Sequence, residues 1–121
     1  GEVNLMKGTT NYELIELLKA LEPKIVESPF WRRVVKDLTK SSRQRRSVNV
    51  YKIDKYAREG EMVLVPGKVL SLGEMSKKVD VAAFNFSAEA KKKIEQANGK
   101  IMTIKELLEQ NPEGKKVRIL G

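Results

Sequence analysis

The chain has 121 residues, of which 40% are hydrophobic, and it carries a formal net charge of +8. This length allows one domain with a modest core, and the lack of a signal-peptide core or of an apolar run near the roughly 20 residues that span a bilayer predicts an intracellular protein. Cysteine and histidine are both absent, which excludes disulfides, thiolate and imidazole metal ligands and the usual acid–base group, and argues against an enzyme.

The N-terminal part is expected to be helical. Residues 1–10 show no periodicity and are predicted to be a flexible segment ahead of a single domain over residues 11–121. Thr10 and Glu13 have the spacing of a capping box, and Pro23 is expected to stop or bend the helix that they begin. The core face of this first helix consists of Leu14, Leu17, Leu18 and Leu21.

A second helix is predicted from Ser28 and Pro29, because a capping hydroxyl followed by proline is typical of a helix start. Its inward row is Phe30, Val34 and Leu38. Its outward cations are Arg32, Arg33 and Lys36. Trp31 can pack in the core or stack on a base, and packing is favoured.

This helix leads into residues 40–47, a run with four cations, no acid and no large apolar side chain. Burying unpaired guanidinium groups costs too much for such a segment, so we expect it at the surface. Arginine supplies three of the four charges, and its planar fork suits phosphate oxygens. A solvated charge run without function is the alternative, because short basic clusters occur on many proteins.

The positive charge is concentrated around this run. Residues 30–58 contain ten lysines and arginines against two acids, a net charge of +8, whereas the rest of the chain holds fourteen of each sign. A charge-balanced body with one basic segment is typical of a polyanion binder.

Residues 49–57 are predicted to form a third, short helix. One face carries Val50, Ile53 and Ala57, and the other carries Tyr51, Lys52 and Lys55. Tyr51 and Tyr56 can stack on exposed bases while the lysines meet phosphates, or they can cover the edges of the core, and the sequence leaves both interpretations open.

After Gly60 the pattern changes to alternating strands and helices, which predicts an α/β fold. Short strands are expected over residues 62–65 and 68–70, with a turn at Pro66 and Gly67 between them. Residues 79–86 form the strongest strand, which is apolar on both faces in its middle and is therefore expected at the centre of the sheet.

The last elements are predicted from their caps. Ser87 caps a helix that Gly99 ends in a left-handed conformation. On this helix we expect the lysines at 91–93 to form a solvated face. Thr103 and Glu106 form a capping box for another helix. Brief strands are expected over residues 100–102 and 116–120.

Five blocks in this order resemble a known family. They are 43–46 (RQRR) leading into 48–53 (VNVYKI), 65–70 (VPGKVL), 81–87 (VAAFNFS), 103–108 (TIKELL) and 117–121 (VRILG). From about Asn11 to Gly121 the chain is similar to the archaeal form of large-subunit ribosomal protein L-eighteen-e, a relative of bacterial ribosomal protein L-fifteen. The basic pair at 115–116 and the tip at 72–74 depart from the family pattern.

The resemblance implies an irregular superhelix of strand–strand–helix turns with a helical, basic N-terminal part over residues 11–60 and mixed strands and helices over residues 61–121. It implies a noncatalytic, structural constituent of the large ribosomal subunit in the cytoplasm. The partners would be large-subunit rRNA and neighbouring ribosomal proteins, and we expect no cofactor, metal, membrane or small-molecule substrate and a monomer in isolation. An extra-ribosomal RNA-binding regulator is the alternative.

The predicted RNA-binding residues combine this resemblance with the charge and aromatic pattern. By matching position the resemblance implies the arginines at 32–33, the run at 40–46, Asn49, Lys52 and Lys68, and the residue pattern adds the others. The full set is Arg32, Arg33, Lys36, Lys40, Ser41, Arg43, Gln44, Arg45, Arg46, Asn49, Tyr51, Lys52, Lys55 and Lys68.

Overall fold

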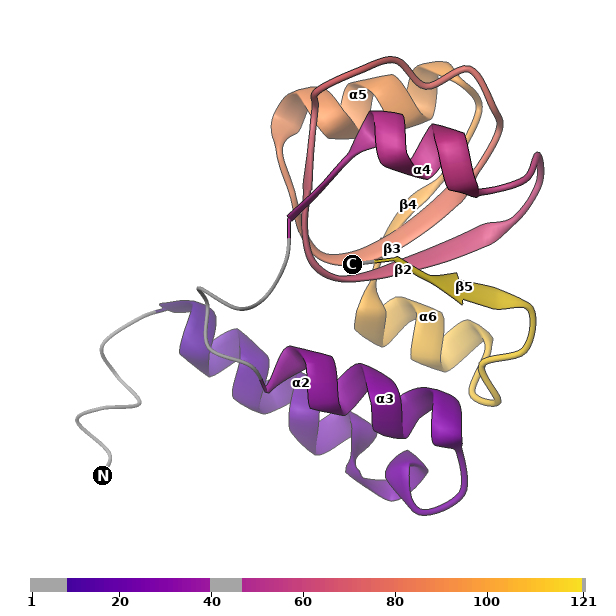
Figure 1. Cartoon of the computed structure of the whole chain (residues 1–121). Coiled ribbons are helices and arrows are strands. Elements are labelled where there is room, and N and C mark those ends of the chain that lie inside the picture. The colour runs from indigo at the N-terminus through magenta and orange to yellow at the C-terminus, as the bar shows by residue number, and fades with distance from the viewer. Residues whose placement is uncertain (1–8, 40–46, 121) are drawn as a thin grey trace.

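A parallel, five-stranded sheet lies between two layers of helices (Figure 1). The structure is a computed structural model that describes residues 9–39 and 47–120, with the backbone alone for residues 9–11. In chain order the elements are α2 (Thr9–Ile25), α3 (Pro29–Leu38), β1 (Ser47–Asn49), α4 (Val50–Tyr56), β2 (Met62–Leu70), β3 (Asp80–Phe86), α5 (Ala88–Gln96), β4 (Ile101–Thr103), α6 (Ile104–Gln110) and β5 (Val117–Ile119).

Strand β2 organises the sheet, because β1, β3 and β5 all pair with it. β5 lies beside residues 62–64 and β1 beside residues 68–70, while β3 runs along the opposite edge of β2 and pairs in turn with β4. The central position predicted for β3 and the α/β class are both confirmed. The superhelical path that the resemblance implied stays a prediction.

Alternate residues of the central strands supply two separate cores. In β2, Val63 and Val65 belong to the core under α4 and α5, whereas Leu64 belongs to the core under α2, α3 and α6. In β3, Val81 and Ala82 divide in the same way. Since successive side chains of a strand point to opposite faces, a strand covered on both sides must be apolar throughout.

Helix α2 differs from the prediction at both ends. It begins at Thr9, so Thr10 is not its N-cap, and it continues through Pro23 to Ile25. Proline in the last turn removes a single backbone hydrogen bond, and the helix therefore ends shortly after it instead of at it. The leucine row is confirmed as a core face, because Leu17 and Leu21 are buried.

Trp31 ties α3 to the distant end of the chain. Its side chain is fully buried, and its indole Nε1 donates a hydrogen bond to the carbonyl oxygen of Pro112 at 2.8 Å. Its ring meets the ring of Phe30 edge to face, with centroids 4.8 Å apart. The prediction that Trp31 packs in the core is confirmed. The predicted cap of this helix is also confirmed, because the Trp31 amide donates to the Ser28 hydroxyl.

The structure corrects two predictions near β2. The third helix begins at Val50, because residues 47–49 form a strand that pairs with residues 68–70. The turn predicted at Pro66 and Gly67 is wrong, since both residues lie within β2. Proline has no N–H for the ladder, and the strand accommodates it through a register shift between Val65 and Lys68.

The remaining caps are confirmed with one exception. Ser87 accepts a hydrogen bond from the Ala90 amide, and the capping box of Thr103 and Glu106 is complete. The left-handed residue after α5 is Asn98, at φ 69°, and not Gly99. A side chain at Gly99 would overlap the carbonyl oxygen of Val79, so close packing against the chain before β3 explains this glycine.

Candidate nucleic-acid interface

The three predicted cations of α3 are all exposed, but they differ in what they contact. Arg32 Nε donates to the carbonyl oxygen of Ile25 at 3.0 Å, and its Nη2 lies 3.4 Å from the carbonyl oxygen of Val26. A guanidinium at these carbonyls stabilises the C-terminal end of α2. Arg33 Nε lies 3.9 Å from the carboxylate of Asp37, which is half-buried. Arg32 is therefore partly structural, and Lys36 is exposed to solvent.

The predicted residues Lys40, Ser41, Arg43, Gln44, Arg45 and Arg46 lie outside the described residues. Both neighbours of this segment are described. Thr39 closes α3, with its hydroxyl donating to the Lys36 carbonyl oxygen at 2.9 Å, and Ser47 begins β1. Segment 40–46 therefore joins α3, in one helix layer, to a strand of the sheet.

An exposed polar row lies next to the point where this segment enters the sheet. Lys68 pairs in register with Ser47 on one side and with Asn85 on the other, and all three are exposed. The pairing of β1 with β2 thus brings the predicted residue Lys68 beside the end of the basic run, from which it is distant in the sequence. Sequence reasoning missed Asn85 as part of this row, and its only signal was a polar residue between Phe84 and Phe86.

Helix α4 presents the aromatic and basic face that the sequence predicted. Val50, Ile53 and Ala57 are buried, while the Tyr51 side chain is 51% exposed. Lys55 is exposed, and its Nζ lies 5.4 Å from the centroid of the Tyr56 ring, within the range of a cation–π contact. Lys52 is half-buried. Of the two tyrosines, Tyr51 has no such lysine over its ring among the described residues.

The loop at residues 71–79 holds Tyr51 in place. The Tyr51 amide donates to the Leu72 carbonyl oxygen at 3.1 Å, and the Leu72 amide donates to Asn49 Oδ1 at 3.2 Å. Gly73 packs so closely that an added Cβ would overlap the Cβ of Tyr51. The predicted residue Asn49 thus uses its side-chain oxygen to fix the loop.

Asp54, about one turn further along α4, fixes the same loop. It accepts hydrogen bonds from the Ser76 amide, the Ser76 hydroxyl and the Lys77 amide at 3.0–3.1 Å. Burial alone would raise the pKa of Asp54, but these hydrogen bonds and the Lys77 charge outweigh it and lower the pKa below its ordinary value of 3.8. This carboxylate is therefore ionised at neutral pH and anchors the loop to α4.

Lys93 of α5 is hydrogen-bonded to this loop and does not lie on a solvated lysine face, which corrects the prediction for residues 91–93. Its Nζ donates to the carbonyl oxygens of Ser71 and Gly73. Lys91 and Lys92 are exposed as expected. The loop between β2 and β3 is thus hydrogen-bonded to both α4 and α5. The two helices that cover this face of the sheet are therefore linked through the loop that contacts Tyr51.

Within the described residues no cluster of acids could hold a metal ion, and no helix is long and apolar enough to cross a membrane. The predicted RNA-binding residues that the structure describes are thus exposed or half-buried side chains on α3, β1, α4 and β2. Those of α3 lie in one helix layer and those of α4 in the other (Figure 1). The chain passes from one group to the other through segment 40–46.

Comparison with known proteins agrees with the blocks seen in the sequence. The family described as "Ribosomal protein 60S L18 and 50S L18e" matches residues 7–121. The chain belongs to this family. It is 45% identical to large ribosomal subunit protein eL18 of Methanococcus maripaludis, over 93% of this chain and 96% of that protein. It is 48% identical to the eL18 protein of Methanopyrus kandleri, over 93% and 94%, and 41% identical to that of Sulfurisphaera tokodaii, over 93% and 94%.

Proposed function

We propose that this eL18-family chain is a noncatalytic, structural constituent of the large ribosomal subunit that binds large-subunit rRNA. Its relatives carry the name of a large ribosomal subunit protein and match it over nearly the whole of both chains. A constituent of this particle lies with rRNA and neighbouring ribosomal proteins in the cytoplasm. The observation that carries the proposal is this family match together with the concentration of charge in residues 30–58.

The basic region that meets the RNA consists of the cations of α3, segment 40–46, the exposed face of α4 and Lys68. Arg33, Lys36, Lys55 and Lys68 are exposed cations on three different elements around the ends of segment 40–46. Cations on rigid elements on both sides of an arginine-rich run suit the neutralisation of phosphates from RNA strands that lie close together. Tyr51 adds an aromatic surface on which an unpaired base can stack.

We infer that residues 11–121 act as one rRNA-binding domain that joins the particle as a monomer. Its two cores share the sheet, so the helical N-terminal half and the mixed C-terminal half cannot separate without exposing apolar surface. The superhelical course that the family implies for the C-terminal half belongs to the same inference. The domain needs no cofactor to present its cations.

The proposal is tested by replacing Arg43, Arg45 and Arg46 together with alanine. Binding to a transcript of large-subunit rRNA, measured by filter binding at fixed salt, should weaken by at least tenfold, because fewer phosphates are neutralised and fewer counterions are released. The melting temperature should stay within a few degrees of the wild type. Alanine at the exposed lysines 19, 100 and 105 is the matched control and should leave binding nearly unchanged.

Equal weakening in both triple variants would contradict a localised basic region. Loss of folding in the arginine variant would show that the run is structural. Sedimentation of the full chain with purified large subunits at moderate salt separates the subunit protein from an extra-ribosomal regulator, because a regulator would stay in the supernatant.

A further inference from the structure

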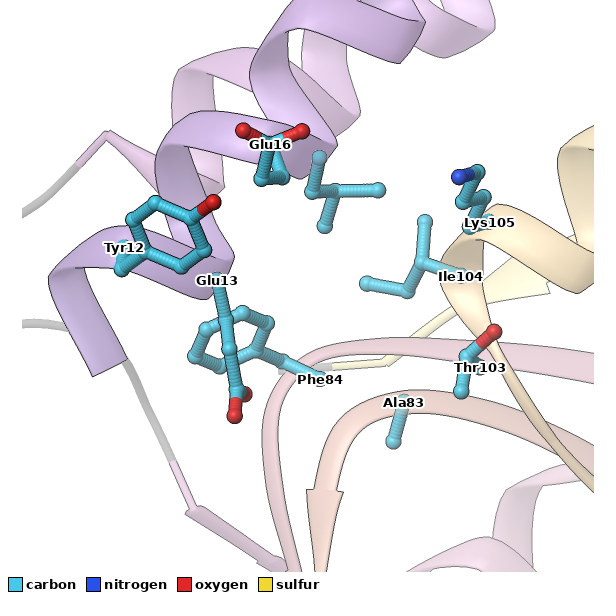
Figure 2. A pocket seen from close by; sticks show the side chains of 9 residues that line it. Tyr12, Glu13, Glu16, Ala83, Phe84, Thr103, Ile104 and Lys105 are labelled. Atoms are coloured by element: carbon cyan, nitrogen blue, oxygen red, sulfur yellow. The ribbon is translucent and has the colours of Figure 1, made fainter. Parts of the chain in front are cut away.

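An apolar groove opens on the side of the molecule that carries α2 (Figure 2). Leu17 and Phe84 form its floor with Ile104, and the groove encloses about 280 Å³. This is smaller than the roughly 300–1,000 Å³ of small-molecule sites, and larger than a roughly 150 Å³ cavity that accepts one benzene ring. A groove of this size has room for one large apolar side chain.

The rim of this groove carries acids on one wall. Glu13 and Glu16 stand on α2, and Lys105 stands on the opposite wall at the start of α6 (Figure 2). Both glutamates are exposed, and neither carboxylate has a hydrogen bond or an ion pair within the residues that the structure describes. Tyr12, which is 64% exposed, borders the same opening.

The charge at the rim of this groove disfavours RNA, which is the partner that the basic region attracts. Two exposed carboxylates on one wall against a single lysine on the other make the rim net negative, which disfavours phosphates, and the apolar floor has few polar groups with which to hold a base. The same features favour a polypeptide that inserts an apolar side chain and sets a cation against the acids. Covering an exposed apolar groove on a protein surface is favourable by the hydrophobic effect, and complementary charges at the rim select the partner.

We propose that this groove, here called the acid-rimmed groove (Leu17, Phe84 and Ile104 with Glu13 and Glu16), docks a basic segment of a neighbouring ribosomal protein. The segment places one large apolar side chain on the floor and a lysine or arginine against Glu13 and Glu16. The inference rests on the proposed function, because it assumes the large subunit as the place where such a neighbour is found. The chain thus meets rRNA through one region and a protein through another.

The test places the photo-reactive residue benzoylphenylalanine at position 12 of the full chain, which is then assembled into large subunits. Irradiation and mass spectrometry should identify a crosslinked segment of another ribosomal protein that has lysine or arginine within three residues of a large apolar side chain. The same residue at position 105, on the opposite wall, is a second probe in case the first variant does not fold. Crosslinks confined to rRNA, to a second copy or to residues 1–8 of the same chain would overturn the proposal.

A charge reversal makes the test specific for the rim. Glu13→Lys with Glu16→Lys, in the photo-reactive chain, should lower the crosslink yield at least tenfold. The control pair Glu95→Lys with Glu109→Lys lies on exposed positions of α5 and α6 and should leave the yield unchanged. An unchanged yield after reversal at the rim would overturn the proposal. Failure of the unaltered chain to sediment with large subunits would instead overturn the proposed function.

Discussion

Tyr51 combines an exposed ring with a fixed backbone. Half of its side chain is open to solvent, while its amide is bound to Leu72 and its Cβ packs on Gly73. An aromatic ring whose position is already restrained loses little conformational entropy when a base stacks on it. We therefore propose that Tyr51 stacks on a base, in place of the alternative that it only covers the edge of the core.

We expect Tyr51→Phe to retain rRNA binding and Tyr51→Ala to weaken it by about 1–3 kcal/mol, because stacking needs the ring and not the hydroxyl. Filter binding with the same transcript measures both. Tyr12→Ala is the control, since Tyr12 is also open to solvent but borders the acid-rimmed groove. Wild-type affinity in Tyr51→Ala would mean that no base stacks there.

Gly73 is required for two independent reasons, a left-handed backbone at φ 98° and its close approach to Tyr51. Gly60, at φ 83°, shares the first reason alone, because nothing lies within 4 Å of an added Cβ. Gly60→Ala should therefore cost about 1–2 kcal/mol. Gly73→Ala should cost about 1–3 kcal/mol more, as overpacking does.

Urea unfolding of the two glycine variants measures this difference directly. Gly73→Ala should also weaken rRNA binding slightly, since it displaces Tyr51, whereas Gly60→Ala should not. Equal free energies of unfolding in the two variants would show that the loop at residues 71–79 moves away from Tyr51 without strain.

At the scale of elements, Glu61 and Arg118 connect the start of β2 to β5. Arg118 Nε donates to Glu61 Oε1 at 2.9 Å, and Arg118 Nη2 donates to Glu61 Oε2 at 3.2 Å. The Glu61 carboxylate also accepts from the Arg58 amide at 2.8 Å. The hydrogen bonds from the Arg118 side chain and then from the Arg58 amide hold the pKa of Glu61 below its ordinary value of 4.5. The pair reinforces a strand of only three residues at the C-terminal end of the fold.

A lowered pKa means that Glu61 stabilises the fold when it is ionised. Its contribution is complete above pH 4.5 and is lost as the pH falls through the lower pKa of the folded state. Because the pair is partly exposed, we expect Glu61→Gln to cost at most about 1 kcal/mol at pH 7 and less near pH 3. Urea unfolding at the two pH values measures this change, with the exposed Glu59→Gln as the control. The same cost at both pH values would contradict the role of the ionised carboxylate.

At the scale of the whole molecule, the charge is divided between two surfaces. The basic region carries the excess positive charge, and the acid-rimmed groove lies between α2, β3 and the start of α6. In the proposed function the basic region contacts rRNA and the acid-rimmed groove contacts a protein segment. Surfaces of opposite charge direct the two partners to different parts of the molecule. The sheet and its two cores hold the surfaces in a constant relation.

The division predicts how rRNA affinity depends on salt. With about six to ten phosphate contacts, affinity for the transcript should fall by roughly 10³ to 10⁵ between 50 and 200 mM salt. Alanine at Arg43, Arg45 and Arg46 should reduce the slope of this dependence by about one for each phosphate that is no longer neutralised. A slope that is unchanged in the triple variant would place the phosphate contacts elsewhere on the chain.

Local patterns in the sequence were enough for much of the fold. The caps at Ser28, Ser87 and Thr103 and the leucine face of α2 could be predicted, because each depends on residues within one or two helical turns. The central position of β3 followed from its apolar middle. The family could be recognised for a related reason, since five short blocks in a fixed order need no knowledge of their contacts.

Contacts between distant residues decided the rest. The turn predicted at Pro66 became part of a strand because β3 pairs along β2 on both sides of the proline. Residues 47–49 form a strand because residues 68–70 lie beside them. Lys93 does not lie on the solvated face, because its ammonium group donates to carbonyl oxygens of a loop 20–22 positions away in the sequence.

Composition and local periodicity thus determined that this chain is an α/β protein with a concentrated basic segment, because charge and capping are properties of neighbouring residues. Only the tertiary structure decided that Arg32 and Asn49 hold the protein together as well as facing its surface. It also decided that Glu13 and Glu16 border an apolar groove. A side chain's partners depend on which distant segments fold beside it, and no local pattern contains that information.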